Sequence, residues 1–142
     1  VEMQSPRRPE PVGLGDAFGR RFSWEGPFDR LRRLNLEGCR IGAVLDALAF
    51  LDFDAFPSLT DLDLSGNDIT DDVVQELVSS SLWPRLTHLV LGGNPIGDEA
   101  AVAIADASDR SRLQYLNVRF TDIGVRGQQA LLSRFGGKVD LF

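Results

Sequence analysis

The sequence predicts an α/β solenoid in which each repeat contributes one short strand and one helix. Two observations indicate this fold: one spacing of apolar residues occurs four times, and successive copies begin 28, 27 and 27 residues apart. Repeats of roughly 20–50 residues are typical of solenoids, because a single repeat can bury its apolar face only against its neighbours. The four copies are Leu31-Leu34-Leu36-Cys39-Ile41, Leu59-Leu62-Leu64-Asn67-Ile69, Leu86-Leu89-Leu91-Asn94-Ile96 and Leu113-Leu116-Val118-Thr121-Ile123.

Each copy begins with a short strand that has one buried face. Leu34 and Leu36 alternate with the polar residues Arg33, Asn35 and Glu37, which is the two-residue period of a half-buried strand. The ninth position of the motif holds Asn, Cys or Thr. We expect this side chain to point inward and to hydrogen-bond backbone groups that would otherwise be buried without a partner.

The rest of each repeat is long enough for a helix on the convex side. Segments 71–80 and 98–107 each place apolar residues on one face, namely Val74, Leu77 and Val78 in the first and Ala101, Ile104 and Ala105 in the second. Both segments open with acidic residues, whose carboxylates oppose the positive end of the helix dipole. These acidic residues are Asp71, Asp72, Asp98 and Glu99.

Length and composition fit a single domain, since 142 residues of which 43% are hydrophobic can fill one continuous core. We expect a flexible tail rich in Pro and Arg over residues 1–17 and a repeat domain over 18–142. An open solenoid end must be covered. The domain is therefore divided into an aromatic N-terminal cap at 18–30, four repeats at 31–134 and a C-terminal capping strand at 135–142.

Composition also disfavours several classes of protein. The chain shows no run of about 18 apolar residues and no signal peptide, and a single cysteine excludes an internal disulfide framework. We therefore expect a cytoplasmic protein without a membrane span. Residues 1–40 have a net charge of +2 and residues 41–142 a net charge of −8, which sum to −6. The negative charge of residues 41–142 repels phosphate groups, so nucleic-acid binding is disfavoured. A basic protein is the expected partner.

The repeats resemble leucine-rich repeats of the ribonuclease-inhibitor type. The resemblance rests on the spacing and on the segments LSGNDITD (64–71) and LGGNPIGDEAA (91–101). The ending QALLSRFGGKV (129–139) is also similar to that of bacterial leucine-rich repeat proteins with a repeat-companion domain. The resemblance covers roughly residues 28–142. It implies a right-handed solenoid of about four repeats plus caps, with a short parallel sheet on the concave side, helices on the convex side, and a concave surface that binds protein.

The register of the strands predicts which side chains lie on the concave surface, because residues that flank the strand leucines point away from the core. They form three columns: Arg33, Asp61, His88, Tyr115 and Lys138; Asn35, Asp63, Val90, Asn117 and Asp140; and Glu37, Ser65, Gly92, Arg119 and Phe142. Aromatic residues and arginine are enriched at binding hot spots, so Tyr115 and Arg119 are the expected anchors. The candidate partner-binding residues are Arg33, Asp61, Asp63, His88, Val90, Tyr115, Asn117 and Arg119; an ordinary solvated surface is the alternative.

A second candidate surface is a phenylalanine stripe in the helical segment of the first repeat. Phe50, Phe53 and Phe56 occur at every third residue. Two interpretations stay open. The side chains either pack beneath the following loop or form an apolar patch through which the chain associates with a second copy or a partner.

The sequence predicts no catalytic residue, no metal site and no cofactor. Cys39 is expected at an inward position and His88 on the outer face, roughly 10 Å away at about 4.8 Å per strand. The pattern from Asp61 to Gly66 resembles the start of a calcium loop, but Leu62 and Leu64 are needed as buried strand residues.

The sequence therefore predicts a non-catalytic protein-interaction module. The alternative is that the chain is a substrate-selecting or regulatory arm of a larger enzyme or effector. Because the chain begins at Val1 with a Pro- and Arg-rich segment, that alternative places the catalytic domain upstream.

Overall fold

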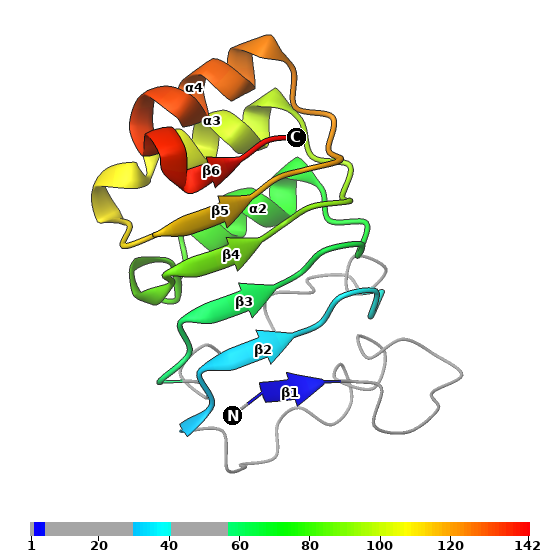
Figure 1. Cartoon of the computed structure of the whole chain (residues 1–142), viewed down its shortest axis with the longest axis vertical. Helices are drawn as coiled ribbons and strands as arrows, with labels where there is room; N and C mark the ends of the chain where they lie inside the picture. Colours follow the sequence, from blue (N-terminus) through cyan, green and yellow to red (C-terminus); the bar gives the residue numbers. More distant parts are fainter. Residues whose placement is uncertain (1, 5–29, 41–56) are drawn as a thin grey trace.

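The computed structural model describes residues 2–4, 30–40 and 57–142, which form the stacked rungs of a solenoid. Six parallel strands lie side by side in chain order (Figure 1): β1 (Glu2–Gln4), β2 (Arg33–Asn35), β3 (Asp61–Asp63), β4 (His88–Val90), β5 (Tyr115–Asn117) and β6 (Val139–Asp140). The helices α2 (Asp71–Val78), α3 (Asp98–Asp106) and α4 (Val125–Phe135) lie behind this sheet. Short 3-10 turns lead back toward the strands: η5 (Trp83–Arg85), η6 (Ser108–Arg110) and η7 (Gly136–Lys138). The predicted α/β solenoid is confirmed.

The motif leucines form the apolar core that the stacked strands share. Leu62, Leu89 and Leu116 lie opposite one another in neighbouring strands and are at most 2% exposed. The same holds along each rung, where Leu59, Leu64, Leu86, Leu91, Leu113 and Val118 are also buried. The alternation read from the sequence therefore assigned each strand residue to the correct face.

Asparagine side chains fasten each turn to its neighbour inside the protein. Asn94 Nδ2 donates to the carbonyl oxygens of Leu64, Leu91 and Gly92 at 3.0, 2.9 and 3.3 Å. Its Oδ1 accepts the backbone N–H groups of Asn67 and Ile69 of the preceding repeat at 2.8 and 3.0 Å. Asn67 repeats the donor pattern. Both asparagines are buried, which confirms the inward role expected at the ninth position.

The acidic residues that open the helices cap the next helix along the chain. Asp71 Oδ1 accepts the N–H of Gly97, the residue that precedes α3, at 2.7 Å. Asp98 Oδ1 accepts the N–H groups of Gly124 and Gly127 at the start of α4, at 2.7 and 3.1 Å. Neither α2 nor α3 has a side-chain cap from its own N-cap residue. The carboxylates therefore satisfy free N–H groups of the neighbouring helix and join successive repeats.

The structure differs from the expected flexible tail at residues 2–4. These residues form β1, which pairs in parallel with β2 and places Met3 opposite Leu34. An extended segment fits there because the edge of β2 offers N–H and C=O groups that need partners. The other residues of the tail and the cap segment 18–29 lie outside the described residues, as do Phe50, Phe53 and Phe56.

Two helices end slightly earlier than the sequence indicated. α2 ends at Val78 and α3 at Asp106, whereas the expected ends were residues 80 and 107. In α2 the Ser80 hydroxyl donates to the Leu77 carbonyl at 2.7 Å and so satisfies a terminal acceptor. None of the helices in the described segments has the length and apolar character that a membrane crossing requires.

Replacing Asn94 with alanine should destabilise the fold severely. The change removes three hydrogen bonds to carbonyl groups and two hydrogen bonds from backbone N–H groups, all in the protein interior. The Leu64 and Gly92 carbonyls each keep a second donor, Asn67 Nδ2 and the Gly66 N–H. We expect the free energy of unfolding to fall by about 3 kcal/mol or more, measured by urea denaturation. The matched control is Asn35→Ala, which removes one exposed hydrogen bond to Glu37 N and should cost about 0.5–1 kcal/mol. Equal losses in the two variants would contradict the interior role of Asn94.

Gly127 in α4 should not tolerate a methyl group. A Cβ atom there would lie 2.7 Å from Asp98 Oδ1 and 2.8 Å from the Cβ of Ala101. Gly127→Ala should therefore lower the free energy of unfolding by about 1–3 kcal/mol, although alanine ordinarily stabilises helices. At Gly137 a Cβ would meet no atom within 4 Å. Gly137→Ala is accordingly the control in thermal unfolding, and a stabilised Gly127→Ala variant would disprove the close α3–α4 contact.

Candidate binding surface

All eight residues predicted to bind a partner lie on the sheet or directly after it. The strand register aligns Arg33, Asp61, His88 and Tyr115 in one column. The second column is likewise in register, from Asn35 through Val90 to Asp140. We call the sheet face that the helices leave open the concave face (Figure 1). The strand register agrees with the first two predicted columns, whereas the role of this face in binding stays a prediction.

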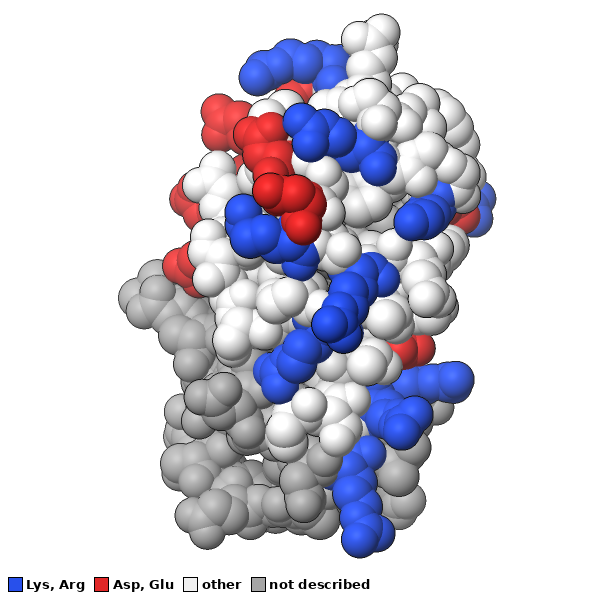
Figure 2. All heavy atoms as spheres, turned by 90° about the vertical axis from the view of Figure 1, so that its left-hand side faces the viewer, with Lys and Arg blue, Asp and Glu red and all other residues white. Residues whose placement is uncertain are grey.

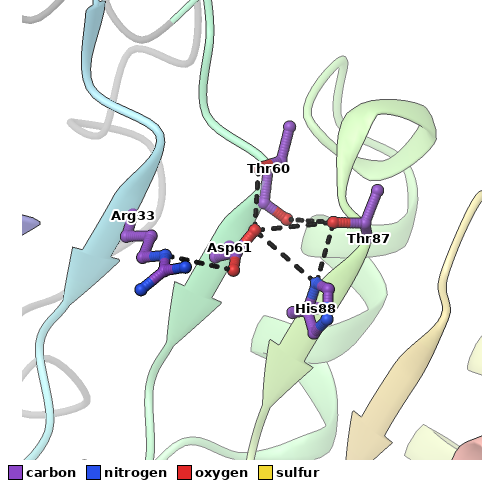
Figure 3. Close-up of polar contacts among 5 residues, drawn as sticks. All are labelled: Arg33, Thr60, Asp61, Thr87 and His88. Carbon is purple, nitrogen blue, oxygen red and sulfur yellow. Dashed lines mark hydrogen bonds and ion pairs between the residues drawn. The ribbon is translucent and has the colours of Figure 1, made fainter. Parts of the chain in front are cut away.

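Asp61 is the centre of a polar cluster in the first column (Figure 3). Its Oδ1 accepts the Thr60 hydroxyl at 2.7 Å, and its Oδ2 lies 3.6 Å from Nε of Arg33. His88 Nδ1 lies 3.6 Å from Asp61 Oδ1 and 2.9 Å from the Thr87 hydroxyl. The carboxylate is partly shielded, with 28% of its side chain exposed, whereas Arg33 is 67% exposed. Asp61 thus positions its neighbours, and Arg33 and His88 present their outer atoms to solvent.

A second polar network surrounds Tyr115. The phenol oxygen accepts a hydrogen bond from Asn117 Nδ2 at 3.0 Å and donates to Asp140 Oδ2 at 3.4 Å. The Tyr115 ring also approaches the His88 ring, with 6.3 Å between the ring centroids. The two networks therefore meet at the centre of the face. Such contacts hold the Tyr115 ring in one orientation, which lowers the entropic cost of binding.

Three polar side chains of the second column hydrogen-bond the backbone just after their own strands. Asn35, Asp63 and Asn117 each accept the N–H of the residue two positions later, at 2.9, 3.0 and 2.9 Å. Asp63 Oδ1 also accepts the Ser65 hydroxyl at 2.6 Å. One side-chain oxygen of Asp63 and of Asn117 is therefore already hydrogen-bonded within the chain. Val90 stands at the equivalent position in β4 and is free of that role because its side chain has no acceptor.

Phe120, which was not among the predicted binding residues, lies beside the third column. Its side chain is 80% exposed, and the Arg119 guanidinium lies over its ring, 5.2 Å from the centroid. Phe120 has φ of +58°, at the turn position where the other three described repeats have a glycine with positive φ: Gly38, Gly66 and Gly93. A signal was available, because aligning the repeats places Phe120 against three glycines.

Arg119 is the anchor with an unsatisfied donor. Its Nε is buried and has no hydrogen-bond partner within the described residues. The preceding repeat has Gly92 at the equivalent place, where a Cβ would come within 3.0 Å of the Arg119 carbonyl oxygen. The absence of a side chain at Gly92 therefore permits the close approach of the turns that follow β4 and β5.

Cys39 and His88 lie on opposite faces of the sheet. Cys39 is buried, and its Sγ donates weakly to the Glu37 carbonyl oxygen at 3.7 Å. His88 projects from β4 onto the concave face, where 46% of its side chain is exposed. The two do not form a nucleophile and base pair. In the described segments, no three His, Cys, Asp or Glu side chains are grouped to hold a metal ion.

Comparison with known families agrees with this geometry. A family model described as "Leucine Rich repeat" matches residues 57–78 and 85–105, which include β3, α2, β4 and most of α3. No curated protein matches the chain. The two matched repeats support a leucine-rich repeat protein. Since β2 and β5 stack on the matched strands in the same register, the fold is an α/β leucine-rich repeat solenoid.

Proposed function

We propose that this chain is a non-catalytic module that binds a protein partner through its concave face. Leucine-rich repeats generally mediate protein–protein interaction, and solenoids use extended concave surfaces for this purpose. The observation that most supports the proposal is the corner formed by Tyr115, Arg119 and Phe120. It combines an oriented phenol, an arginine and an exposed aromatic ring, which are the groups enriched at binding hot spots.

Phe120 supports the proposal through its conformational cost. A bulky residue in the left-handed region costs on the order of 1–2 kcal/mol compared with glycine. The exposed ring recovers little of this cost within the chain, because its contact with Arg119 is worth about 0.5–1 kcal/mol at an exposed site. A partner that covers the ring would supply the missing stabilisation. The same partner could offer an acceptor to Arg119 Nε.

The charges on the concave face indicate what the partner presents. Four carboxylates stand among three cationic side chains: Glu37, Asp61, Asp63 and Asp140 among Arg33, Arg119 and Lys138. Asp61 already faces Arg33 and His88, whereas no ion pair within the described residues involves Asp63 or Asp140. The basic partner expected from the composition would therefore place its cationic groups over the second column and an acceptor near Arg119.

Disabling both predicted anchors should abolish partner capture. The double variant Tyr115→Ala/Arg119→Glu removes the aromatic contact and reverses the charge of the unsatisfied donor. We expect at least a tenfold loss of the captured partner in affinity capture from the native organism, quantified by mass spectrometry, because hot-spot truncations cost about 2 kcal/mol or more. The control is Gln114→Ala/Arg126→Glu, which makes similar changes at exposed residues off the concave face. Undiminished capture by the anchor variant would refute the proposal.

Replacing Phe120 with glycine should separate binding from stability. The change restores the residue that the other repeats use at this turn and relieves the left-handed strain. The free energy of unfolding should therefore stay equal or rise by up to about 1 kcal/mol, while partner capture falls. Leu132→Ala is the control, since it removes another exposed apolar group from α4. A Phe120→Gly variant that is less stable and binds normally would show that the ring serves the fold.

A further inference from the structure

Basic side chains gather at the edge where the strands begin. We call this the basic edge and define it as the described segments that lead into the strands, residues 30–32, 57–60, 79–87, 106–114 and 134–138. Because parallel strands in register start at the same edge, these segments lie side by side. They hold seven basic residues and two acidic ones: Arg30, Arg32, Arg85, Arg110, Arg112, Arg134 and Lys138 against Asp106 and Asp109. Figure 2 shows the Lys and Arg side chains as a band along the molecule.

The opposite edge has the reverse charge. The described segments that leave the strands and enter the helices are residues 37–40, 65–72, 92–99 and 119–126. They hold seven acidic and three basic residues: Glu37, Asp68, Asp71, Asp72, Asp98, Glu99 and Asp122 against Arg40, Arg119 and Arg126. The overall charge of −6 therefore hides a separation of charge across the sheet. The net charges of residues 1–40 and 41–142 do not reveal this separation, because the two sets of residues alternate within every repeat.

Three of the basic residues stabilise the fold by bonding to the preceding repeat. Arg85 Nη1 donates to the Pro57 carbonyl oxygen and Arg110 Nη2 to the Val78 carbonyl oxygen, each at 3.3 Å. Arg134 donates in the same way to the Ser108 hydroxyl at 3.3 Å. Val78 is the last residue of α2, so Arg110 satisfies a terminal carbonyl and opposes the negative end of the helix dipole.

The remaining four basic residues have no such role. The side chains of Arg30, Arg32, Arg112 and Lys138 are exposed and make no hydrogen bond or ion pair with any other residue that the structure describes. Their like charges repel one another along one edge. The stability of the solenoid therefore does not explain why they stand together.

We propose that the basic edge binds an acidic segment of a partner protein, rich in Asp and Glu. Strands lie about 4.8 Å apart, so the edge spans roughly 20 Å, or about six residues of extended chain. Guanidinium groups bind carboxylates through paired hydrogen bonds, and the arginines already held by backbone contacts need little further ordering. Apart from Lys138, which stands where the two surfaces meet, this surface is separate from the concave face. The inference therefore does not depend on the proposed concave site.

The composition of the edge favours a carboxylate ligand over phosphate ligands. Asp106 and Asp109 lie within the band, with Asp109 Oδ1 3.9 Å from Arg110 Nη1, and would repel a continuous phosphate backbone. The tryptophan of these segments, Trp83, is fully buried, so the described edge offers no exposed ring on which a base could stack. Nor does any exposed large apolar side chain of the described segments lie there to enter a lipid surface.

The test measures binding of a fluorescein-labelled decaglutamate peptide to the full 142-residue chain by fluorescence anisotropy at low and physiological salt. Arg32→Glu/Arg112→Glu should weaken binding at least about tenfold, because it reverses two exposed charges on the edge. The matched control is Arg40→Glu/Arg126→Glu on the opposite edge. Each double variant changes the net charge by −4, from −6 to −10. The control should therefore weaken binding less than about threefold, and wild-type binding should weaken as salt rises.

Two further probes separate the ligand classes. A ten-nucleotide oligothymidylate and vesicles of phosphatidylserine and phosphatidylcholine should bind more weakly than decaglutamate. The proposal is overturned by tighter binding of either probe, by equal losses in the two double variants, or by no decaglutamate binding to the wild-type chain. Arg112→Gln/Lys138→Gln, which removes charge without adding carboxylates, should also weaken binding. Circular dichroism checks that every variant is folded.

Discussion

Hydrogen bonding inside the turns is the constraint on which the other surfaces of this solenoid depend. Each rung must turn its chain from the sheet toward the helices within the protein interior, where water cannot satisfy the backbone. Asn67 and Asn94 provide those partners and bridge to the adjacent rungs at the same time. A shift of one rung by a single residue would break these bonds and expose the leucines. The register is therefore fixed, and with it the columns on the concave face and the charges at the two edges.

The fixed register explains why the sequence predicted the strands and columns correctly. A period of two for the strand and of 27 or 28 for the repeat determines which residue lies opposite which, without knowledge of any contact. Tyr115 was thus aligned with His88 from spacing alone, and the structure confirms the alignment. Side-chain contacts between repeats could not be predicted in this way. The bond from Asp98 to Gly124 depends on the distance between two helix ends, which no residue pattern specifies.

The repeat spacing does not predict a role for residues that depart from the repeat pattern. Phe120 interrupts a series of glycines, and Arg119 follows Gly92 in its column. Glycine adopts the left-handed conformation of this turn without strain, so the bulky residue there is one basis for the proposed role of Phe120 in binding. Residue type alone predicts Tyr115 and Arg119 as anchors. Phe120 is distinguished by its place opposite three glycines in the aligned repeats, and the structure adds its positive φ angle.

The separation of charge between the edges follows from the opposite directions of strands and helices. Helix N-termini lie at the edge where strands end, so carboxylates such as Asp71 and Asp98 gather there. Arg110, which meets the C-terminus of α2, lies at the other edge. Capping of helix ends explains some of the charged residues at each edge. It does not explain the exposed basic side chains that make no hydrogen bond or ion pair with the described residues.

The concave face and the basic edge should therefore differ in how they bind. On the concave face, rings and carboxylates held in networks would favour one partner geometry, and the affinity of the proposed partner would depend on shape and desolvation. On the basic edge, charges that reach into solvent act over about a Debye length and raise the rate of encounter. A partner that used both surfaces would be oriented first by its charge and then held by the corner around Tyr115 and Phe120. Added salt would in that case slow association far more than it speeds dissociation.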